Sequence, residues 1–196
     1  MMGALCIAPF ALAENEAMVA TCAQCIGDIC LRPKLMSDAD LVKRYGAGDK
    51  KDDVIEKNVI DNRTRCYFDE TQGLWVLADI LPPPNMYVVG IHVSTQPLCK
   101  NAVHPKKPFP KLSLKTGLSI GDSEPSALQQ CGKPSRVEDA VAREKRNQRY
   151  KDDPGFGQRF GRRSLAYFPE GDDSLLMLKV QITDGKVVSL WLNDSP

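Results

Sequence analysis

The sequence is poor in the residues on which most enzyme sites depend. Its 196 residues include two histidines, His92 and His104, and neither has the spacing of a metal ligand. A nucleophilic side chain is usually activated by a neighbouring histidine, and no G-x-S-x-G nucleophile elbow is present. No glycine pair stands between a strand and a helix, as a phosphate-binding loop requires. We therefore expect a protein that is not an enzyme and that binds no metal or cofactor.

Long hydrophobic runs and a strong charge of either sign are also lacking. After the first 13 residues, no apolar stretch approaches the roughly 20 residues that cross a bilayer. The 26 basic residues nearly balance the 25 acidic ones, giving a net charge of +1. Such a balance produces no overall field that would attract nucleic acid or an anionic membrane. The composition, 42% hydrophobic and 26% charged, is that of a globular protein without a transmembrane segment.

Residues 1–13 (MMGALCIAPFALA) have the character of a secretory signal peptide. They carry no charge, are mostly apolar and end in a small-x-small pattern at Ala11-Leu12-Ala13. The basic segment that normally precedes the apolar one is missing, and a buried N-terminal segment is the alternative. The interpretation that we prefer is export to the periplasm or out of the cell.

Cysteine usage agrees with export. Six of the seven cysteines follow the signal segment, and an even number in an exported chain predicts three disulfides. The spacing does not choose among the many possible pairings. The alternative is that Cys22-x-x-Cys25 is the redox pair of a thiol-disulfide oxidoreductase. The disulfide candidates are Cys22, Cys25, Cys30, Cys66, Cys99 and Cys131.

Four blocks of the sequence occur twice in the same order. The pairs of similar blocks are 37–46 with 123–132, 63–70 with 163–170, 74–80 with 176–182, and 88–91 with 187–190. A recurring order of this kind predicts two copies of one structural unit. We expect an α+β fold of two tandem repeats, each a helix followed by a three-stranded antiparallel sheet, with the helices packed on one face of the sheets.

The repeats set the expected domain boundaries. The first repeat, with its N-terminal cysteine cluster, covers residues 14–94, and the second covers residues 112–196. Between them, residues 95–111 contain four prolines and are expected to form an extended linker. Residues 136–163 interrupt the second repeat with nine basic and five acidic residues. This basic excess leaves open a structural envelope protein that binds anionic polymers through the insertion.

Local signals place the ends of the two expected helices. Ser37 and Ser123, or the aspartates beside them, can cap the helix starts. Gly46 and Gly132 can end the helices, because glycine readily adopts the conformation that follows the last turn. Both helices would have about ten residues and would be unstable alone, so we expect them to pack on a sheet.

Part of the second repeat resembles a known family pattern. The matching motifs are Gly117-Leu118, Gly121-Asp122-Ser123, Leu128 and Gly132-Lys133-Pro134, followed by DGKVV at residues 184–188. They resemble small exported proteins of the SmpA/OmlA group, which includes the BamE-like lipoprotein of the outer-membrane β-barrel assembly machinery. The tandem arrangement is similar to that of β-lactamase inhibitory proteins. The resemblance covers residues 115–135 and 164–193 and implies a helix-on-sheet fold that contacts proteins through its sheet face or loops, without catalytic residues.

The sheet face that the helices leave uncovered is expected to carry large side chains. Strand alternation places both tryptophans there, and such aromatic residues are frequent anchors of protein interfaces. We therefore predict a binding module for another protein of the cell envelope or outside the cell, without binding of nucleic acid. The alternative is that the other repeat or the linker covers the tryptophans. The predicted contact residues are Trp75, Leu77, His92, Met177, Lys179 and Trp191.

Overall fold

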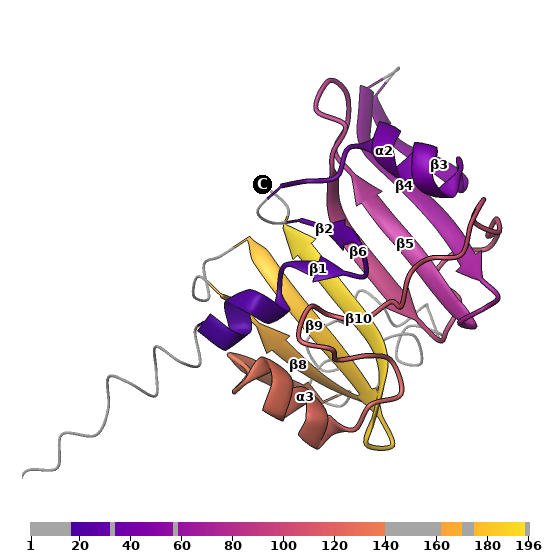
Figure 1. Ribbon diagram of the computed structural model, residues 1–196. Coiled ribbons are helices and arrows are strands. Elements are labelled where there is room, and N and C mark those ends of the chain that lie inside the picture. Colours follow the sequence, from indigo (N-terminus) through magenta and orange to yellow (C-terminus); the bar gives the residue numbers. More distant parts are fainter. Residues whose placement is uncertain (1–16, 32–33, 57–58, 140–161, 170–174, 195–196) are drawn as a thin grey trace, which may run out of the picture.

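A computed structural model describes residues 17–31, 34–56, 59–139, 162–169 and 175–194 of the chain (Figure 1). The predicted signal peptide, residues 1–13, and most of the predicted insertion, residues 136–163, lie outside the described residues. Residues 17–22 are helical, and two further helices are α2 (Asp38–Tyr45) and α3 (Glu124–Cys131). The strands are β1 (Cys25–Ile26), β2 (Ile29–Cys30), β3 (Asp49–Glu56), β4 (Val59–Asp69), β5 (Leu74–Ile80), β6 (Val88–Ser94), β7 (Arg136–Asp139), β8 (Arg163–Tyr167), β9 (Leu176–Thr183) and β10 (Lys186–Asp194).

Eight of these strands form a single antiparallel sheet. Their order is β3-β4-β5-β6-β10-β9-β8-β7, so that β6 and β10 lie at the centre. In Figure 1 the helices, the β1–β2 hairpin and residues 104–118 lie on the same face of this sheet. The buried side chains between these layers form one hydrophobic cluster that includes residues from both halves of the chain.

The predicted α+β fold of two tandem helix-plus-three-strand repeats is therefore wrong. The described chain is mostly β, with one eight-stranded sheet, a two-stranded hairpin and short helices. Each half contributes four strands to the sheet, since β3 and β7 extend it at the two edges. β3 reads DKKDDVIE and β7 reads RVED, so neither shows the apolar alternation by which strands are recognised. Charged side chains suit edge strands because they hinder pairing with further chains. The halves also form no separate sheets, because β6 pairs with β10.

Both helices begin and end at predicted residues. The hydroxyls of Ser37 and Ser123 each accept a hydrogen bond from the backbone amide three residues on, at 3.1 and 3.3 Å. Gly46 and Gly132 follow the last helical residues with φ angles of 87° and 77°, where glycine is favoured. Each helix has eight residues, so its stability depends on packing against the sheet.

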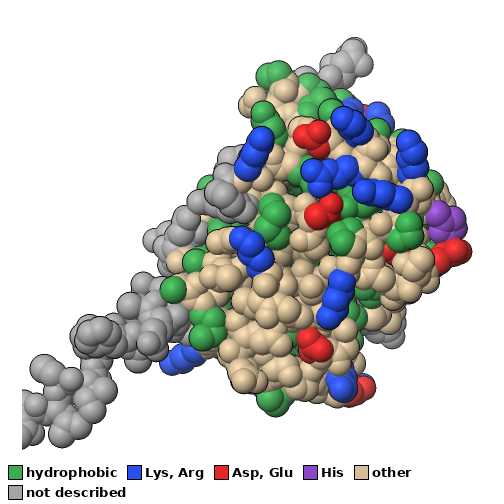
Figure 2. Space-filling view, viewed as in Figure 1, with side chains coloured by type: hydrophobic (Ala, Val, Ile, Leu, Met, Phe, Trp, Pro, Cys, Tyr) green, Lys and Arg blue, Asp and Glu red, His purple; other side chains and the backbone are tan. Residues whose placement is uncertain are grey.

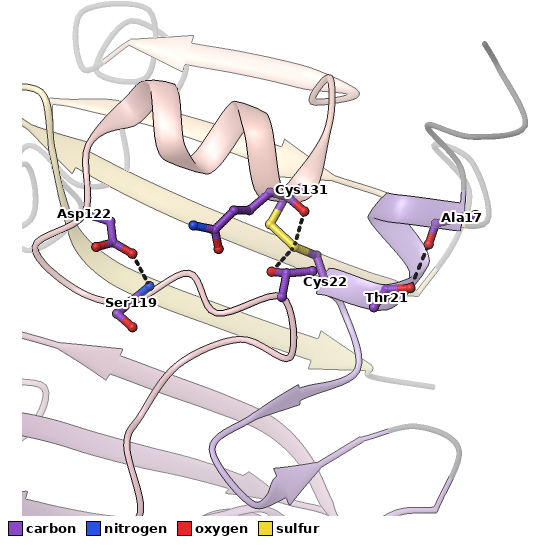
Figure 3. The surroundings of a disulfide bond; sticks show 8 residues. Ala17, Thr21, Cys22, Ser119, Asp122 and Cys131 are labelled. Atoms are coloured by element: carbon purple, nitrogen blue, oxygen red, sulfur yellow. Dashed lines mark hydrogen bonds between the residues drawn. A yellow bond between two sulfur atoms is a disulfide. The ribbon is translucent and has the colours of Figure 1, made fainter.

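The prediction of three disulfides is confirmed. One bridge joins the N-terminal helical segment to the end of α3 across 109 residues, and Figure 3 shows its surroundings. The hydroxyl of Thr116 donates a hydrogen bond of 3.1 Å to the sulfur of Cys22, because a disulfide sulfur carries no hydrogen. Three disulfides are typical of an oxidising, extracytoplasmic compartment. The pairs are Cys22–Cys131, Cys25–Cys30 and Cys66–Cys99.

Residues 104–118, which we call the strap, pack against the helix-covered face of the sheet. Phe109 is buried, and its ring centroid lies 4.1 Å from that of Tyr45 in α2. The carboxylate of Asp69 accepts a hydrogen bond of 2.9 Å from the amide of Phe109. The side-chain amide of Gln72 donates to the carbonyl of Phe109 at 3.1 Å. Asp69 and Gln72 thus hold the strap against the turn between β4 and β5.

A buried ion pair fastens α2 to the sheet. Asp38, the first residue of α2, is 4% exposed and accepts a hydrogen bond of 2.8 Å from Nη2 of Arg65 in β4. Arg65 also donates to the carbonyl of Ala47 at 2.6 Å, just beyond the helix. The neighbouring Arg63 donates to the carboxylate of Asp52 in β3 and holds the pKa of that carboxyl at about 2. These contacts offset the cost of removing charged groups from water.

Replacing Asp38 by asparagine should lower the free energy of unfolding by about 3–5 kcal/mol, because it leaves the buried Arg65 without its counter-charge. Urea denaturation at neutral pH measures this difference. Asp53→Asn is the matched control, since the ion pair of Asp53 with Lys51 is exposed and should contribute less than about 1 kcal/mol. Equal losses in the two variants would show that the Asp38–Arg65 pair does not fasten the helix.

Candidate protein-binding face

Four of the six predicted contact residues lie side by side across the centre of the sheet. Leu77 of β5 is opposite His92 of β6. His92 is in turn opposite Trp191 of β10, and Trp191 is opposite Lys179 of β9. Directly opposed residues of antiparallel strands share a face and have Cβ atoms about 4.5–5.5 Å apart. We call these four residues the central row.

The other two predicted residues lie on the same face, on opposite sides of the central row. Trp75 precedes Leu77 by two positions in β5, and Met177 precedes Lys179 by two positions in β9. The intervening residues, such as Val76, are fully buried in the core on the other face. All six predicted residues therefore lie on one face, which we call the open face because α2, α3 and the strap lie on the other.

The side chain of Trp191 is held by contacts with both of its neighbours in the central row. Its ring centroid lies 5.9 Å from that of His92, with an interplanar angle of 29°. The ammonium group of Lys179 lies 4.9 Å from the centroid of the indole, where the negative face of the ring attracts a cation. The indole remains partly exposed. A side chain that is already held in one orientation loses little conformational freedom when a partner binds it.

His92 is buried, whereas the other five predicted residues are partly exposed. It is 7% exposed, and burial lowers the pKa of its imidazole to about 4, so the ring is neutral at pH 7. Its Nε2 shares a hydrogen bond of 2.5 Å with the hydroxyl of Ser189. His92 therefore packs beside the ring of Trp191 from the neighbouring strand and offers little surface of its own to a partner.

A row of buried polar side chains lies beside the central row and was not selected from the sequence. Its members are opposed on four adjacent strands, and each is at most 2% exposed. The side-chain oxygen of Gln181 has no hydrogen-bond partner among the described residues. In the sequence, these residues could have been recognised as the polar positions of strands that otherwise alternate with apolar residues. Its members are Ser94, Ser189, Gln181 and Ser164.

Asp79 is a further residue of the open face that the predicted set omits. Burial raises the pKa of its carboxyl to about 6, although a hydrogen bond from Asn62 acts in the opposite direction. The carboxylate lies over Gly90 on the neighbouring strand, where an added Cβ atom would come within 2.6 Å of it. Because glycine has no Cβ atom, the carboxylate of Asp79 can occupy the space above residue 90. The charge of the open face therefore changes near pH 6.

The redox alternative requires Cys22 and Cys25 to form one dithiol pair. The structure places them in different bridges, with Cys131 and Cys30 respectively. Both cysteines are buried. The pair on which that alternative depends is therefore not formed here.

Neither a metal centre nor a membrane-spanning helix is found in the part of the chain that the structure describes. No three histidine, cysteine, aspartate or glutamate side chains gather there as ligands would. No helix there combines the length and the apolar character needed to cross a membrane. No protein-family model, curated protein or solved structure matches the chain. The resemblance to the SmpA/OmlA group stays a prediction that rests on its motifs.

Protonation of His92 should destabilise the native protein in acid. Because the pKa is about 4 in the folded chain against an ordinary 6.5, the unfolded chain takes up the proton first as the pH falls. The stability that depends on the neutral ring is complete above pH 6.5 and should fall by about 2.5 kcal/mol by about pH 4.5.

Urea denaturation of the wild type and His92→Gln across this pH range isolates the contribution, since all other groups titrate in both proteins. The wild type should lose more stability than the variant as the pH falls. A difference between the two proteins that does not change with pH would contradict the burial of a neutral imidazole.

Proposed function

We propose that this chain is an exported, disulfide-stabilised binding module that docks a protein partner through the open face of its sheet. The observation that carries the proposal is the central row, in which a supported, partly exposed Trp191 lies between residues of neighbouring strands. Tryptophan is enriched among the few residues that carry most of the binding energy of an interface. The role is one of binding and not of catalysis.

The side chains around Trp191 indicate the kind of partner. Trp75 and Met177 offer apolar contact on the two sides of the central row, and within the row Leu77 adds apolar contact and Lys179 a cation. A partner with an aromatic or aliphatic side chain at the centre of its surface and polar groups around it fits this arrangement. Addition of a partner strand to an edge is disfavoured, because β3 and β7 are both rich in charged residues.

The compartment that we propose is the periplasm or the exterior of the cell. Three disulfides persist in such oxidising compartments, and the apolar N-terminal residues have the pattern of a signal peptide. The resemblance to the SmpA/OmlA group supports the same role, since the fold of that group implies contact with proteins through the sheet face or loops.

Trp191→Ala should weaken partner binding by about 30-fold or more, the loss expected at a dominant interface residue. The partner is captured from an extract of the cell envelope with the wild-type protein, and its affinity for each variant is then measured. Leu128→Ala is the control, because Leu128 is 40% exposed on α3, on the other side of the sheet.

Near-ultraviolet circular dichroism and the melting temperature establish that both variants are folded. The proposal predicts loss of affinity in Trp191→Ala and unchanged affinity in Leu128→Ala. Unchanged affinity in the tryptophan variant, or equal losses in both, would contradict docking through the open face.

A further inference from the structure

A second surface, on the side of the molecule that carries the helices, accumulates positive charge. Residues 95–121 contain five lysines and no aspartate or glutamate, although the whole chain has a net charge of only +1. Four of these lysines lie in the strap, which packs on the helix-covered side of the sheet. The net charge of the whole chain is therefore close to zero although this segment has a local excess of positive charge.

Specific contacts bring part of the strap next to the C-terminal end of α2. The amide of Lys106 donates a hydrogen bond of 2.8 Å to the carbonyl of Tyr45, the last residue of the helix. The ammonium group of Lys107 lies 5.7 Å from the centroid of the Tyr45 ring. Lys43 and Arg44 occupy the last turn of the same helix. Figure 2 shows lysine and arginine side chains gathered on this face, with few acidic side chains among them.

Most of these cations have no acidic partner. Arg44 is paired with Asp28 at 2.9 Å. In the described part of the chain, no ion pair involves the four exposed lysines 43, 106, 107 and 111. One or two cations are expected at a helix C-terminus because they complement its partial negative charge. Lys43, Lys106 and Lys107 at the end of α2 already exceed that structural need. Together with Lys111, four residues further along the strap, we call them the lysine patch.

We propose that the lysine patch binds the phosphate headgroups of an anionic lipid bilayer. Lysine ammonium groups act as point charges toward phosphate and lack the planar fork with which arginine selects a single carboxylate. The one arginine here, Arg44, is already paired with Asp28. A lipid surface presents many phosphates at once and needs no shaped groove. The patch lies on the side opposite the open face, so this inference stands independently of the proposed function.

The strap is suited to present these lysines in a fixed arrangement. Prolines at positions 105, 108 and 110 restrict its backbone. Buried Phe109 and Leu112 anchor it between the lysines, so the charged side chains project from a segment that is held at several points. Each lysine near an anionic bilayer raises partitioning by about fivefold, and four would act together within about one Debye length of the surface.

The test is sedimentation of the purified protein with vesicles of about 30% phosphatidylglycerol in phosphatidylcholine, compared with vesicles of phosphatidylcholine alone. Lys106→Gln/Lys107→Gln should reduce partitioning into the anionic vesicles by about 30-fold. The control Lys51→Gln/Lys186→Gln makes the same change in net charge at exposed lysines outside the patch, and it should reduce partitioning by less than about threefold. Wild-type binding should disappear at about 0.5 M salt.

Three outcomes would overturn the proposal. The first is equal loss in the two double variants, which would mean that net charge alone matters. The second is equal binding to the two kinds of vesicle. The third is retention of the protein on immobilised polyglutamate without binding to the anionic vesicles, which would assign the patch to an acidic polypeptide instead.

Discussion

The pairing of β6 with β10 is the contact on which the rest of the structure depends. Every residue of β6 is buried, and the two strands lie at the centre of the eight-stranded sheet. Their register places Val93 opposite Leu190 in the core and His92 opposite Trp191 on the open face. A shift of one residue would exchange the two faces, because side chains alternate along a strand. The same register therefore determines the core and the candidate binding face together.

The helix-covered face shows how a wide sheet is protected when its helices are short. Two eight-residue helices leave much of the sheet uncovered, and the β1–β2 hairpin and the strap fill the remaining area. The Cys22–Cys131 bridge holds the N-terminal segment in this layer, and Asp69 holds the strap. The side chains on this face of the sheet are thus buried in the core and stabilise the fold. The open face keeps partly exposed aromatic side chains, and the outer surface of the cover carries the lysine patch.

The parts of the fold that could be predicted from the sequence depend on local patterns. The alternation of apolar and polar residues separated the two faces of β5 and β9. The cap residues Ser37 and Gly46 were recognised because their residue types are those preferred at helix ends. The number of disulfides followed from an even count of cysteines in an exported chain. The six predicted contact residues were chosen from alternation alone, and the structure places them on one face of the sheet.

The parts that could not be predicted depend on long-range contacts or on strands without an apolar pattern. β3 and β7 are edge strands whose charged residues read as loops. The β6–β10 pairing joins residues about a hundred positions apart, and neither strand identifies its partner. Among the three bridges, Cys22–Cys131 joins residues of the two halves and depends on this long-range topology. Ser189 was not among the predicted contact residues, because its burial and its contact with His92 exist only after the sheet has formed.

Calorimetric unfolding of the oxidised protein tests most directly whether the two halves form one unit through the central strand pair. A shared sheet predicts a single transition in which the calorimetric enthalpy equals the van't Hoff enthalpy, because neither half keeps its core without the other. Two resolved transitions, or a calorimetric enthalpy well above the van't Hoff value, would mean that the halves unfold separately. The β6–β10 pairing would then not be the contact that assembles the candidate binding face.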